Sequence, residues 1–446
     1  MTAELMTSEL LTAELLTAKG LADSEVLADR YQRHFGSGRA SMGRMIGDLT
    51  EVESSGAWVT VSSGRRILDF GGYGVYLLGH RHPAVVEAVC EQLQRHPMAS
   101  RVFMEPVSAA AASALAEVTP GDLNLVHFVN SGAEATECAL KLARAHGKTA
   151  LITTRNGFHG KTFGALSVTS KSIYQQPFRP LLPDVTDVKF GDLDELENAL
   201  RRTEGRGCFI VEPVQGEGGV QVPPPGYLSE VSELVWRYDG LLVVDEIQTG
   251  LGRLGSWWGI DGENVVPDLL LVGKGLSGGV IPVAAVVATK KAYEPFARDP
   301  YLHTSTFAGS PVACAAAQAA ITVIREENLP ARAATLGTQL LHGIQDAVAR
   351  YGAGRVVEVR GRGLLIGLEM ASPGLVGELF LNLLDEGVLA NHSLNAAGVL
   401  RLTPPAILTP DEVEIFLRAL ESALMDLTLA PTTPSTNPAT NPSTNP

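Results

Sequence analysis

Five short and almost uninterrupted apolar runs constrain the fold of this 446-residue chain more than any other feature of its sequence. Runs of this length that are rich in leucine or β-branched residues are typical of strands buried on both faces of a parallel sheet. Helical patterns separate them, for example at residues 133–147 and 227–240. The alternation predicts an α/β fold with a doubly wound, mainly parallel sheet. The five runs are LVHFV (125–129), ALITT (150–154), CFIVE (208–212), LLVVD (241–245) and LLLVG (269–273).

The pattern changes after about residue 330. A long helical stretch at 331–352 is followed by strand-like runs at 356–363 and 364–370, which predicts a second, smaller α/β domain. The chain begins with five-residue repeats, a period that fits neither a helix face nor a strand. It ends in PTTPSTNPATNPSTNP, which has too few apolar side chains to order itself. We expect no chemistry at either end.

Charge and composition argue against several classes of protein. The formal charge of −14, from 35 basic and 49 acidic residues, argues against a nucleic-acid partner. The sequence has no run of about 18 apolar residues, so no membrane span is predicted, and its N-terminus does not resemble a signal peptide. The four cysteines are scattered without a C-x-x-C pair, which favours reduced thiols in a cytoplasmic protein.

The stretch LVGKGLSGGVIP, residues 271–282, matches two nucleotide- or substrate-binding patterns at once. Its glycines fit a dinucleotide-binding turn, and Ser277 fits the nucleophile position of a hydrolase. Both patterns require a helix directly after the turn, because the helix N-terminus contributes to the site. Here Pro282 and the run VAAVVA predict a strand instead. Lys274 therefore remains as the candidate reactive group of this stretch. The alternative is that Lys274 is an ordinary surface lysine.

Two other features of the sequence support a reactive role for Lys274. Asp245 ends a predicted buried strand, where ligand groups collect in α/β sheets, although it could equally cap the next turn. Residues 131–133 begin a predicted helix and offer an anion site, and Ser131 with Glu134 also forms a capping-box pattern. An anion site, a carboxylate and a lysine at successive strand ends suit pyridoxal 5'-phosphate (PLP). The glycines beside Lys274 would let the backbone approach this cofactor.

Eight motifs in order, from about residue 45 to residue 425, resemble the class III (ω-) aminotransferases, PLP-dependent enzymes of fold type I. The resemblance is strongest to the putrescine aminotransferase branch, through residues 158–183 and PPPGYL (223–228). The eight motifs are GGYGVYLLGHRHP (71–83), FVNSGAEATECALKLAR (128–144), NGFHGKTFGALSVT (156–169), VEPVQGEGGV (211–220), VVDEIQTGLGRLG (243–255), PDLLLVGKGLSGG (267–279), HTSTFAGSP (303–311) and LRLTPP (400–405).

The resemblance implies roles for residues around the cofactor. Lys274 would form the Schiff base and shuttle the proton, and Asp245 would pair with the pyridine nitrogen. Thr306 would reach the phosphate of the neighbouring subunit, which implies a homodimer with shared active sites, with a tetramer left open. The remaining cofactor contacts are Ser131, Gly132 and Ala133 at the phosphate, Phe158 and Ile247 on the two ring faces, Gln248 near the phenolic oxygen, and His159 and Glu212.

The resemblance also implies substrate contacts, for which Tyr73 is a further candidate. Glu217 and Arg401 correspond to a carboxylate–arginine switch, in which the arginine takes the α-carboxylate of a 2-oxo acid or amino acid. Lys161 stands where many relatives have an arginine that clamps a substrate carboxylate. A lysine lacks that bidentate geometry, so a diamine donor is favoured over carboxylate-bearing ω-amino donors. His392 lies in a segment that approaches the site in relatives, and we assign it no role.

Three functions stay open on the sequence alone. The first is transfer of an amino group, from a terminal amine of a diamine or ω-amino compound, to a 2-oxo acid such as 2-oxoglutarate. The second is another reaction on the same cofactor, such as decarboxylation, elimination or C–C bond formation. The third is a non-enzymatic or NAD-binding protein that uses the glycines of residues 271–282.

The resemblance further implies a division of the chain in which the small domain is built from both ends. We expect a flexible N-terminal segment, two small-domain segments that flank a large PLP-binding domain, and a disordered tail. The N-terminal segment would cover residues 1–30, and the large domain would cover residues 81–332. The small domain would be built from residues 31–80 and 333–428, and the tail would be residues 429–446.

Overall fold

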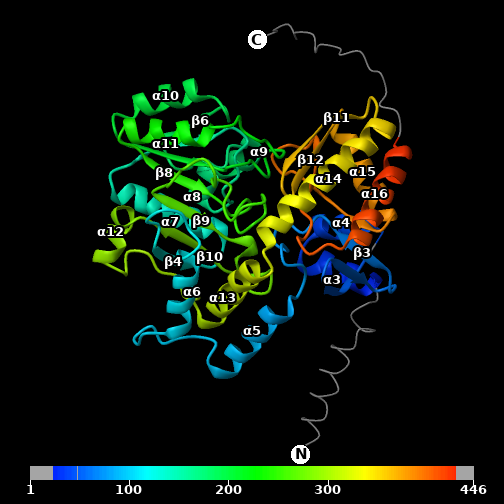
Figure 1. Ribbon diagram of the computed structural model, residues 1–446, viewed down its shortest axis with the longest axis horizontal. Coiled ribbons are helices and arrows are strands. Elements are labelled where there is room, and N and C mark those ends of the chain that lie inside the picture. The colour runs from blue at the N-terminus through cyan, green and yellow to red at the C-terminus, as the bar shows by residue number, and fades with distance from the viewer. Residues whose placement is uncertain (1–23, 48, 428–446) are drawn as a thin grey trace, which may run out of the picture.

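The computed structural model describes residues 24–47 and 49–427 (Figure 1). The five-residue repeats and the expected disordered tail at 429–446 lie outside the described residues. Residues 24–30, which belong to the segment expected to be flexible, form part of helix α3 (Ser24–His34). No helix in the described part of the chain is long and apolar enough to cross a membrane.

A seven-stranded sheet lies at the centre of the larger lobe (Figure 1). The strand order is β4–β10–β9–β8–β7–β5–β6. β10 runs antiparallel to both of its neighbours, whereas the other six strands share one direction, so the sheet is mainly parallel as predicted. β10 is also the strand that the sequence predicts after Pro282. The bounds are β4 (Leu125–Val129), β5 (Ala150–Thr154), β6 (Val185–Val188), β7 (Gly207–Val211), β8 (Leu241–Asp245), β9 (Leu269–Val272) and β10 (Ala284–Ala288).

Helices cover both faces of this sheet, which explains why every residue of its inner strands β10, β9, β8, β7 and β5 is buried. In β8, Leu241 and Val243 pack into the same core as helices α7 and α12. Leu242 and Val244 point to the opposite face, where α10, α11 and α13 pack. Full burial of such a side chain contributes about 1.5–3 kcal/mol, so alternate residues stabilise two different layers. The helices of this lobe are α5 (Pro83–Arg95), α6 (Pro106–Ala116), α7 (Gly132–Ala145), α8 (Phe163–Val168), α9 (Ser172–Gln175), α10 (Leu193–Arg202), α11 (Tyr227–Arg237), α12 (Lys290–Arg298) and α13 (Pro311–Glu326), with short 3-10 helices η1 (Gln176–Phe178) and η2 (Lys274–Ser277).

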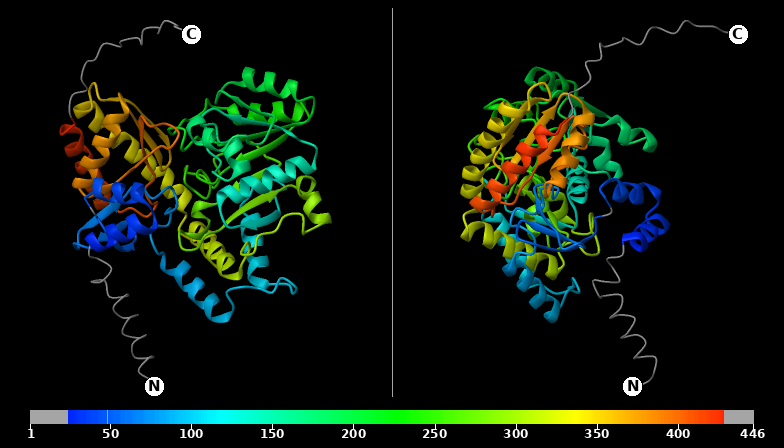
Figure 2. Two further views of the ribbon diagram at one scale, coloured as in Figure 1. Left: turned by 180° about the vertical axis from the view of Figure 1, so that it is seen from behind. Right: turned by 90° about the vertical axis from the view of Figure 1, so that its right-hand side faces the viewer.

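Two four-stranded sheets form the smaller lobe, in the orders β1–β2–β3–β13 and β11–β12–β15–β14. The N-terminal elements, in blue, lie against the C-terminal elements, in orange and red (Figure 1, Figure 2). Strand β13 pairs in parallel with β3, which joins segments more than 300 residues apart. The elements are α4 (Ser37–Met45), β1 (Glu51–Ser55), β2 (Trp58–Val61), β3 (Arg66–Asp69), α14 (Leu329–Tyr351), β11 (Val356–Arg362), β12 (Leu365–Met370), α15 (Pro373–Asp385), β13 (Val388–Leu389), β14 (Asn391–His392), β15 (Val399–Leu402) and α16 (Pro410–Met425). We therefore keep, as a proposal, a small domain that both ends of the chain build.

Candidate active site

The carboxyl ends of three adjacent parallel strands bring together the charged side chains predicted for the site. Glu212 directly follows β7, Asp245 ends β8, and Lys274 follows β9 by two residues. The three strands are neighbours in the order β9–β8–β7. Ligand sites in open α/β sheets form at this edge, because the loops there surround a crevice.

Lys274 is partly buried and adopts an unusual backbone conformation. Its φ angle of 44° lies in the left-handed region, which is rare for a residue other than glycine. Strain of this kind costs on the order of 1–3 kcal/mol and is found mostly at functional sites. Lys274 also begins the 3-10 helix η2, a single short turn that the sequence did not predict.

The surroundings of Lys274 favour its neutral amine. Its pKa is lowered from the ordinary value, mainly because burial disfavours the ammonium. The Arg401 guanidinium acts in the same direction, whereas the Glu217 carboxylate opposes it. Asp245 and Glu212 also oppose the shift, so these charged groups all converge on Lys274.

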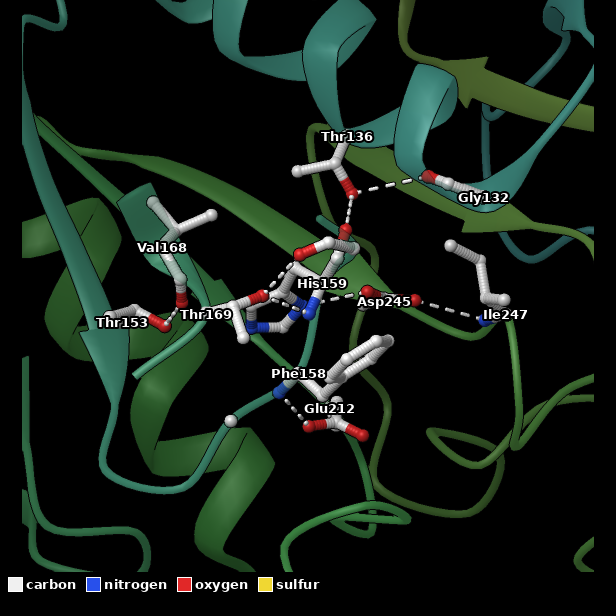
Figure 3. Close-up of polar contacts among 12 residues, drawn as sticks. Gly132, Thr136, Thr153, Phe158, His159, Val168, Thr169, Glu212, Asp245 and Ile247 are labelled. Atoms are coloured by element: carbon white, nitrogen blue, oxygen red, sulfur yellow. Dashed lines mark hydrogen bonds and ion pairs between the residues drawn. The ribbon is translucent and has the colours of Figure 1, made fainter. Parts of the chain in front are cut away.

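Asp245 lies at the centre of a buried hydrogen-bond network (Figure 3). One carboxylate oxygen lies 2.7 Å from His159 Nδ1, and the other accepts the backbone N–H of Ile247 at 3.0 Å. His159 is itself fixed, because its backbone N–H donates to Thr169 and its carbonyl accepts from Thr136. Asp245 therefore caps the following turn, as one reading of the sequence allowed, and is also held in place at the strand end.

Glu212 positions the backbone beside Phe158. One of its carboxylate oxygens accepts the backbone N–H of Phe158 at 3.0 Å (Figure 3). The other accepts the backbone N–H of Gly216 at 3.1 Å. Burial raises the pKa of Glu212 to about 7, and the negative charge of Asp245 adds to this effect while His159 opposes it. The predicted contact residues Phe158, His159 and Glu212 are thus brought together around Asp245.

The N-terminus of α7 has the predicted cap with one change. The Ser131 hydroxyl accepts the backbone N–H of Glu134 at 3.2 Å. The Glu134 carboxylate does not return the bond to Ser131, as a capping box would, but accepts the backbone N–H of Asn130. The first N–H groups of a helix have no partner within it, so those at residues 131–133 can bind an anion. Gly132 packs closely on Ile247, since a methyl group there would lie 2.8 Å from Ile247 Cδ1.

Gln248 lies beside Lys274, as the predicted site requires. A methyl group on Gly74 would lie 3.4 Å from Gln248 Nε2 and 3.7 Å from Lys274 Cδ. Gln248 Nε2 is buried without a hydrogen-bond partner among the described residues. Tyr73, the predicted substrate contact next to Gly74, is exposed.

Gly275, which follows Lys274, was expected to leave space for the cofactor, but its surroundings differ from this expectation. A methyl group on Gly275 would meet Leu251, Leu77 and the Val75 carbonyl at ordinary contact distances of 3.8–3.9 Å. These neighbours belong to the packed interior, so Gly275 does not provide the expected space for a cofactor.

Glu217 and Arg401 form a buried ion pair, although they come from different lobes. Arg401 on β15 is 0% exposed and Glu217 is 4% exposed. Nη1 of Arg401 makes the ion pair, but none of its three guanidinium nitrogens has a hydrogen-bond partner among the described residues. A buried guanidinium whose charge is balanced, but whose donors are partly unused, is suited to bind a further carboxylate.

The other two predicted residues lie at exposed positions. The Lys161 ammonium lies 3.7 Å from the ring centre of Tyr174 and 5.8 Å from that of Phe158, which places it at the rim of the site. Thr306 lines a 510 Å³ pocket that also contacts α7 through Glu134.

Two residues near the site, Arg253 and Tyr174, were not predicted from the sequence. Arg253 is fully buried and donates hydrogen bonds to the carbonyls of Gly74, Leu364 and Pro404, and burial lowers its pKa to about 9. Tyr174 contacts the site through Lys161. Both lie inside stretches that carry the family resemblance, at 243–255 and 158–183, and that position was the only available signal.

A cluster outside the site could hold a metal ion by composition. His127, Cys138 and His303 place possible ligand atoms within 4.8 Å of one another. The Lys141 ammonium lies 3.1 Å from His303 Nδ1. A fixed cation at this distance repels a divalent ion, so we assign no metal to the cluster.

Comparison with known proteins agrees with the fold. The chain matches the family described as Aminotransferase class-III over residues 42–424. Among solved structures, an ornithine aminotransferase from Toxoplasma gondii has 32% identity and a TM-score of 0.81, with 90% of this chain and 97% of that chain covered. An (S)-enantioselective omega-transaminase from Thermomicrobium roseum has 28% identity and a TM-score of 0.84, with 91% and 99% covered.

The fold, the site and these matches together define a PLP-dependent transaminase of fold type I. The chain belongs to the class III aminotransferase family. This outcome rejects the non-enzymatic and NAD-binding alternatives, and it favours amino transfer over other reactions on the same cofactor.

The residues present fit PLP. The site offers a partly buried lysine with a lowered pKa, a buried carboxylate at a strand end and a helix N-terminus for the phosphate. His159 Nε2 and Gln248 Nε2 are also buried without partners among the described residues. The Toxoplasma gondii structure has PLP at partial occupancy in its active site.

Proposed function

We propose that this transaminase moves an amino group from a terminal amine, of a diamine or another ω-amino compound, to a 2-oxo acid such as 2-oxoglutarate. The observation that carries the proposal is the buried pair of Glu217 and Arg401. Arg401 can bind the α-carboxylate of a 2-oxo acid, and Glu217 balances its charge when a donor without that carboxylate is bound. A single site can then accept both substrates, since neither leaves a buried guanidinium unpaired.

The donor proposal rests on Lys161 and on sequence likeness. Lys161 offers a point charge, held over the Tyr174 ring, instead of the bidentate clamp that an arginine would supply to a distal carboxylate. This favours a diamine and supports assignment to the putrescine aminotransferase branch. The solved relatives named above are an ornithine aminotransferase and an omega-transaminase, both compatible with donors that carry a terminal amine.

We assign the cofactor contacts as follows. When bound, PLP supplies an electron sink for the substrate carbon that carries the amino group. Asp245, fixed by His159, would hold the proton of the pyridine nitrogen. Lys274 would bind the cofactor covalently and move the proton at the substrate carbon through Nζ, for which its lowered pKa suits it. The remaining proposed contacts are Ser131, Gly132, Ala133, Phe158, Glu212, Ile247, Gln248 and Thr306, with Tyr73 and Lys161 toward the substrate.

We also propose a homodimer, in which Thr306 reaches the neighbouring subunit's site. Three consecutive apolar side chains, Val102, Phe103 and Met104, are 79–102% exposed. Arg101, just before them, donates from one nitrogen to the carbonyls of Ser305, Thr306 and Ala308 at 2.7–2.8 Å, so the two loops lie together. An exposed apolar patch of this kind is typical of a protein–protein interface.

Separate measurement of the two half-reactions tests the proposed function. Purified holoenzyme is mixed with diamines, ω-amino acids and α-amino acids, and conversion of the cofactor to its pyridoxamine form is followed by absorbance. We expect diamines to convert it and 2-oxoglutarate to restore it. In Arg401→Ala, restoration by 2-oxoglutarate should fall far more than conversion by a diamine. Failure of every terminal amine to convert the cofactor would reject the donor class, and equal losses in Arg401→Ala would reject the switch.

A further inference from the structure

Glu217 is held from two sides by the hairpin that carries Arg401. β14 and β15 pair antiparallel, and residues 393–398 connect them; we call these residues the hairpin tip. One Glu217 carboxylate oxygen forms the ion pair with Arg401. The other accepts the backbone N–H of Leu394 at 2.9 Å, and the Glu217 carbonyl accepts that of Asn395 at 2.9 Å. The same hairpin therefore supplies the cation and the backbone donors that orient this carboxylate.

The hairpin tip is fixed in turn by side chains of the segment after α8. The Tyr174 hydroxyl donates to the Leu394 carbonyl at 3.0 Å, and Lys171 Nζ donates to the Asn395 carbonyl at 2.6 Å. Asn395 Nδ2 donates to the carbonyls of Asn156 and Gly157 at 2.9 and 3.1 Å, directly before Phe158. The tip thus bridges the strand of Arg401 to the backbone that carries the predicted ring contact.

Tyr174 is also close enough to sense the Glu217 charge. Burial raises the pKa of the Tyr174 hydroxyl, and the Glu217 carboxylate raises it further. The ring of Tyr174 holds the Lys161 ammonium at 3.7 Å. Tyr174 is therefore linked to Glu217 through the Leu394 peptide and through electrostatics.

We propose that Tyr174 and Lys171 are positioning residues that, through the hairpin tip, hold Glu217 against Arg401 and so favour donors without an α-carboxylate. The inference rests on the proposed function of the Glu217–Arg401 pair. A 2-oxo acid that binds Arg401 must displace Glu217, and the displaced carboxylate no longer accepts from Leu394. A firmly held tip makes this displacement harder, whereas a loosened tip makes Arg401 easier for the acceptor to reach.

Tyr174→Phe and Lys171→Met test the inference in the holoenzyme. Each removes one donor to the tip, and phenylalanine keeps a ring beneath Lys161. The probes are 2-oxoglutarate and putrescine, or the best amine without an α-carboxylate in the donor screen. We expect kcat/KM for the donor, divided by that for 2-oxoglutarate, to fall about fivefold in each variant, as expected for loss of one ordinary hydrogen bond. The KM for 2-oxoglutarate should fall while kcat stays unchanged.

His392→Ala is the matched control, since His392 is exposed on β14 of the same hairpin. Its kinetic ratio should equal that of the wild type. Hydrogen exchange of the peptide that covers residues 391–400 should become faster in both test variants and stay unchanged in the control. An unchanged ratio of the two kcat/KM values would overturn the inference. Unchanged hydrogen exchange of residues 391–400 in Tyr174→Phe would also overturn it.

The failure of this inference is distinguishable from failure of the proposed function. If Arg401→Ala affects the two half-reactions unequally but Tyr174→Phe and Lys171→Met leave the ratio unchanged, the switch stands and the hairpin inference is rejected. If Arg401→Ala affects both half-reactions equally, the switch itself is rejected, and the hairpin inference is rejected with it.

Discussion

At the residue scale, Asp245 has one property that an isosteric amide cannot copy, its negative charge. Both carboxylate oxygens are used, one at His159 and one at the backbone of Ile247. In Asp245→Asn, the second bond can persist, while the negative charge that we propose to lie opposite the pyridine nitrogen is lost. We expect kcat to fall on the order of 10²-fold or more, the scale of losing one preorganised electrostatic partner. Steady-state kinetics with the best donor would measure this, and circular dichroism would check the fold.

The control for that variant is Asp239→Asn, the same change at an exposed acid that pairs with Lys148. It should keep wild-type kcat. Near-normal turnover in Asp245→Asn would contradict the assignment of Asp245 to the ring nitrogen.

Burial of Lys274 predicts a pH-dependent effect on stability. Its pKa is lowered in the folded chain, so the unfolded chain binds the proton more tightly and this group destabilises the apoenzyme as pH falls. Lys274→Met removes the group. The apo variant should therefore resist urea better than the apo wild type at pH 7, and the difference should shrink as pH rises toward the ordinary lysine value of 10.5. Urea unfolding at several pH values measures this.

Lys189→Met serves as the control, because Lys189 is exposed and keeps its contact with water. The pH series of Lys189→Met gives the background against which the difference for Lys274→Met is measured. A difference for Lys274→Met that grows with pH would show that burial does not disfavour the ammonium.

At the element scale, the start of α7 depends on close packing against Ile247. A methyl group on Gly132 would lie 2.8 Å from Ile247 Cδ1, which forces one of the two to move. Overpacking of this kind costs about 1–3 kcal/mol. We expect Gly132→Ala to lower stability by about that amount and to weaken PLP binding, because the helix N-terminus shifts. Thermal unfolding and titration of the apoenzyme with PLP would measure both effects.

Gly377→Ala provides the matched control for a glycine in a helix. A methyl group there meets nothing within 4 Å, so alanine should be neutral or add up to about 1 kcal/mol of stability. Ile247→Val combined with Gly132→Ala removes the clashing Cδ1 atom and should restore part of the loss. Additive effects of the two changes would argue against direct packing.

The inner strands of the large sheet were predictable because they are buried on both faces, whereas the edge strand β6, with two exposed polar residues, was not predicted. The run 241–245 is β8 itself, and the run 208–212 differs from β7 by one residue at each end. Their apolar character is a local signal, and it needs no knowledge of the partner strands. The helix at 331–352 was predictable for a similar reason, since α14 starts two residues earlier and ends one residue earlier.

Features that depend on contacts between distant segments were not predictable. No local pattern indicates the positive φ of Lys274. The contacts of Tyr174 with Leu394 span 220 residues. The resemblance supplied a list of site residues, but only the fold shows that Glu217 and Arg401 meet as a buried pair.

At the scale of the whole molecule, buried arginines lie where the two lobes meet. Arg253 binds carbonyls from residues 74, 364 and 404, and Arg401 pairs with Glu217. A buried guanidinium must keep its partners, because loss of one leaves an uncompensated charge. The lobes are therefore joined by buried guanidinium groups, and in the proposed dimer the second subunit would complete the site through Thr306.

The proposed dimer can be tested at Phe103, which is 79% exposed between two other exposed apolar residues. Phe103→Asp places a charge in the proposed interface, so we expect the mass in solution, measured by light scattering, to fall to that of one chain. PLP should also bind at least about tenfold more weakly, because the neighbouring Thr306 is lost; a single charge-assisted hydrogen bond is worth about 1.5–3 kcal/mol. Trp236→Asp is the control, since Trp236 is 84% exposed on α11 and outside this patch. An assembled Phe103→Asp enzyme, or dissociation by Trp236→Asp alone, would place the interface elsewhere.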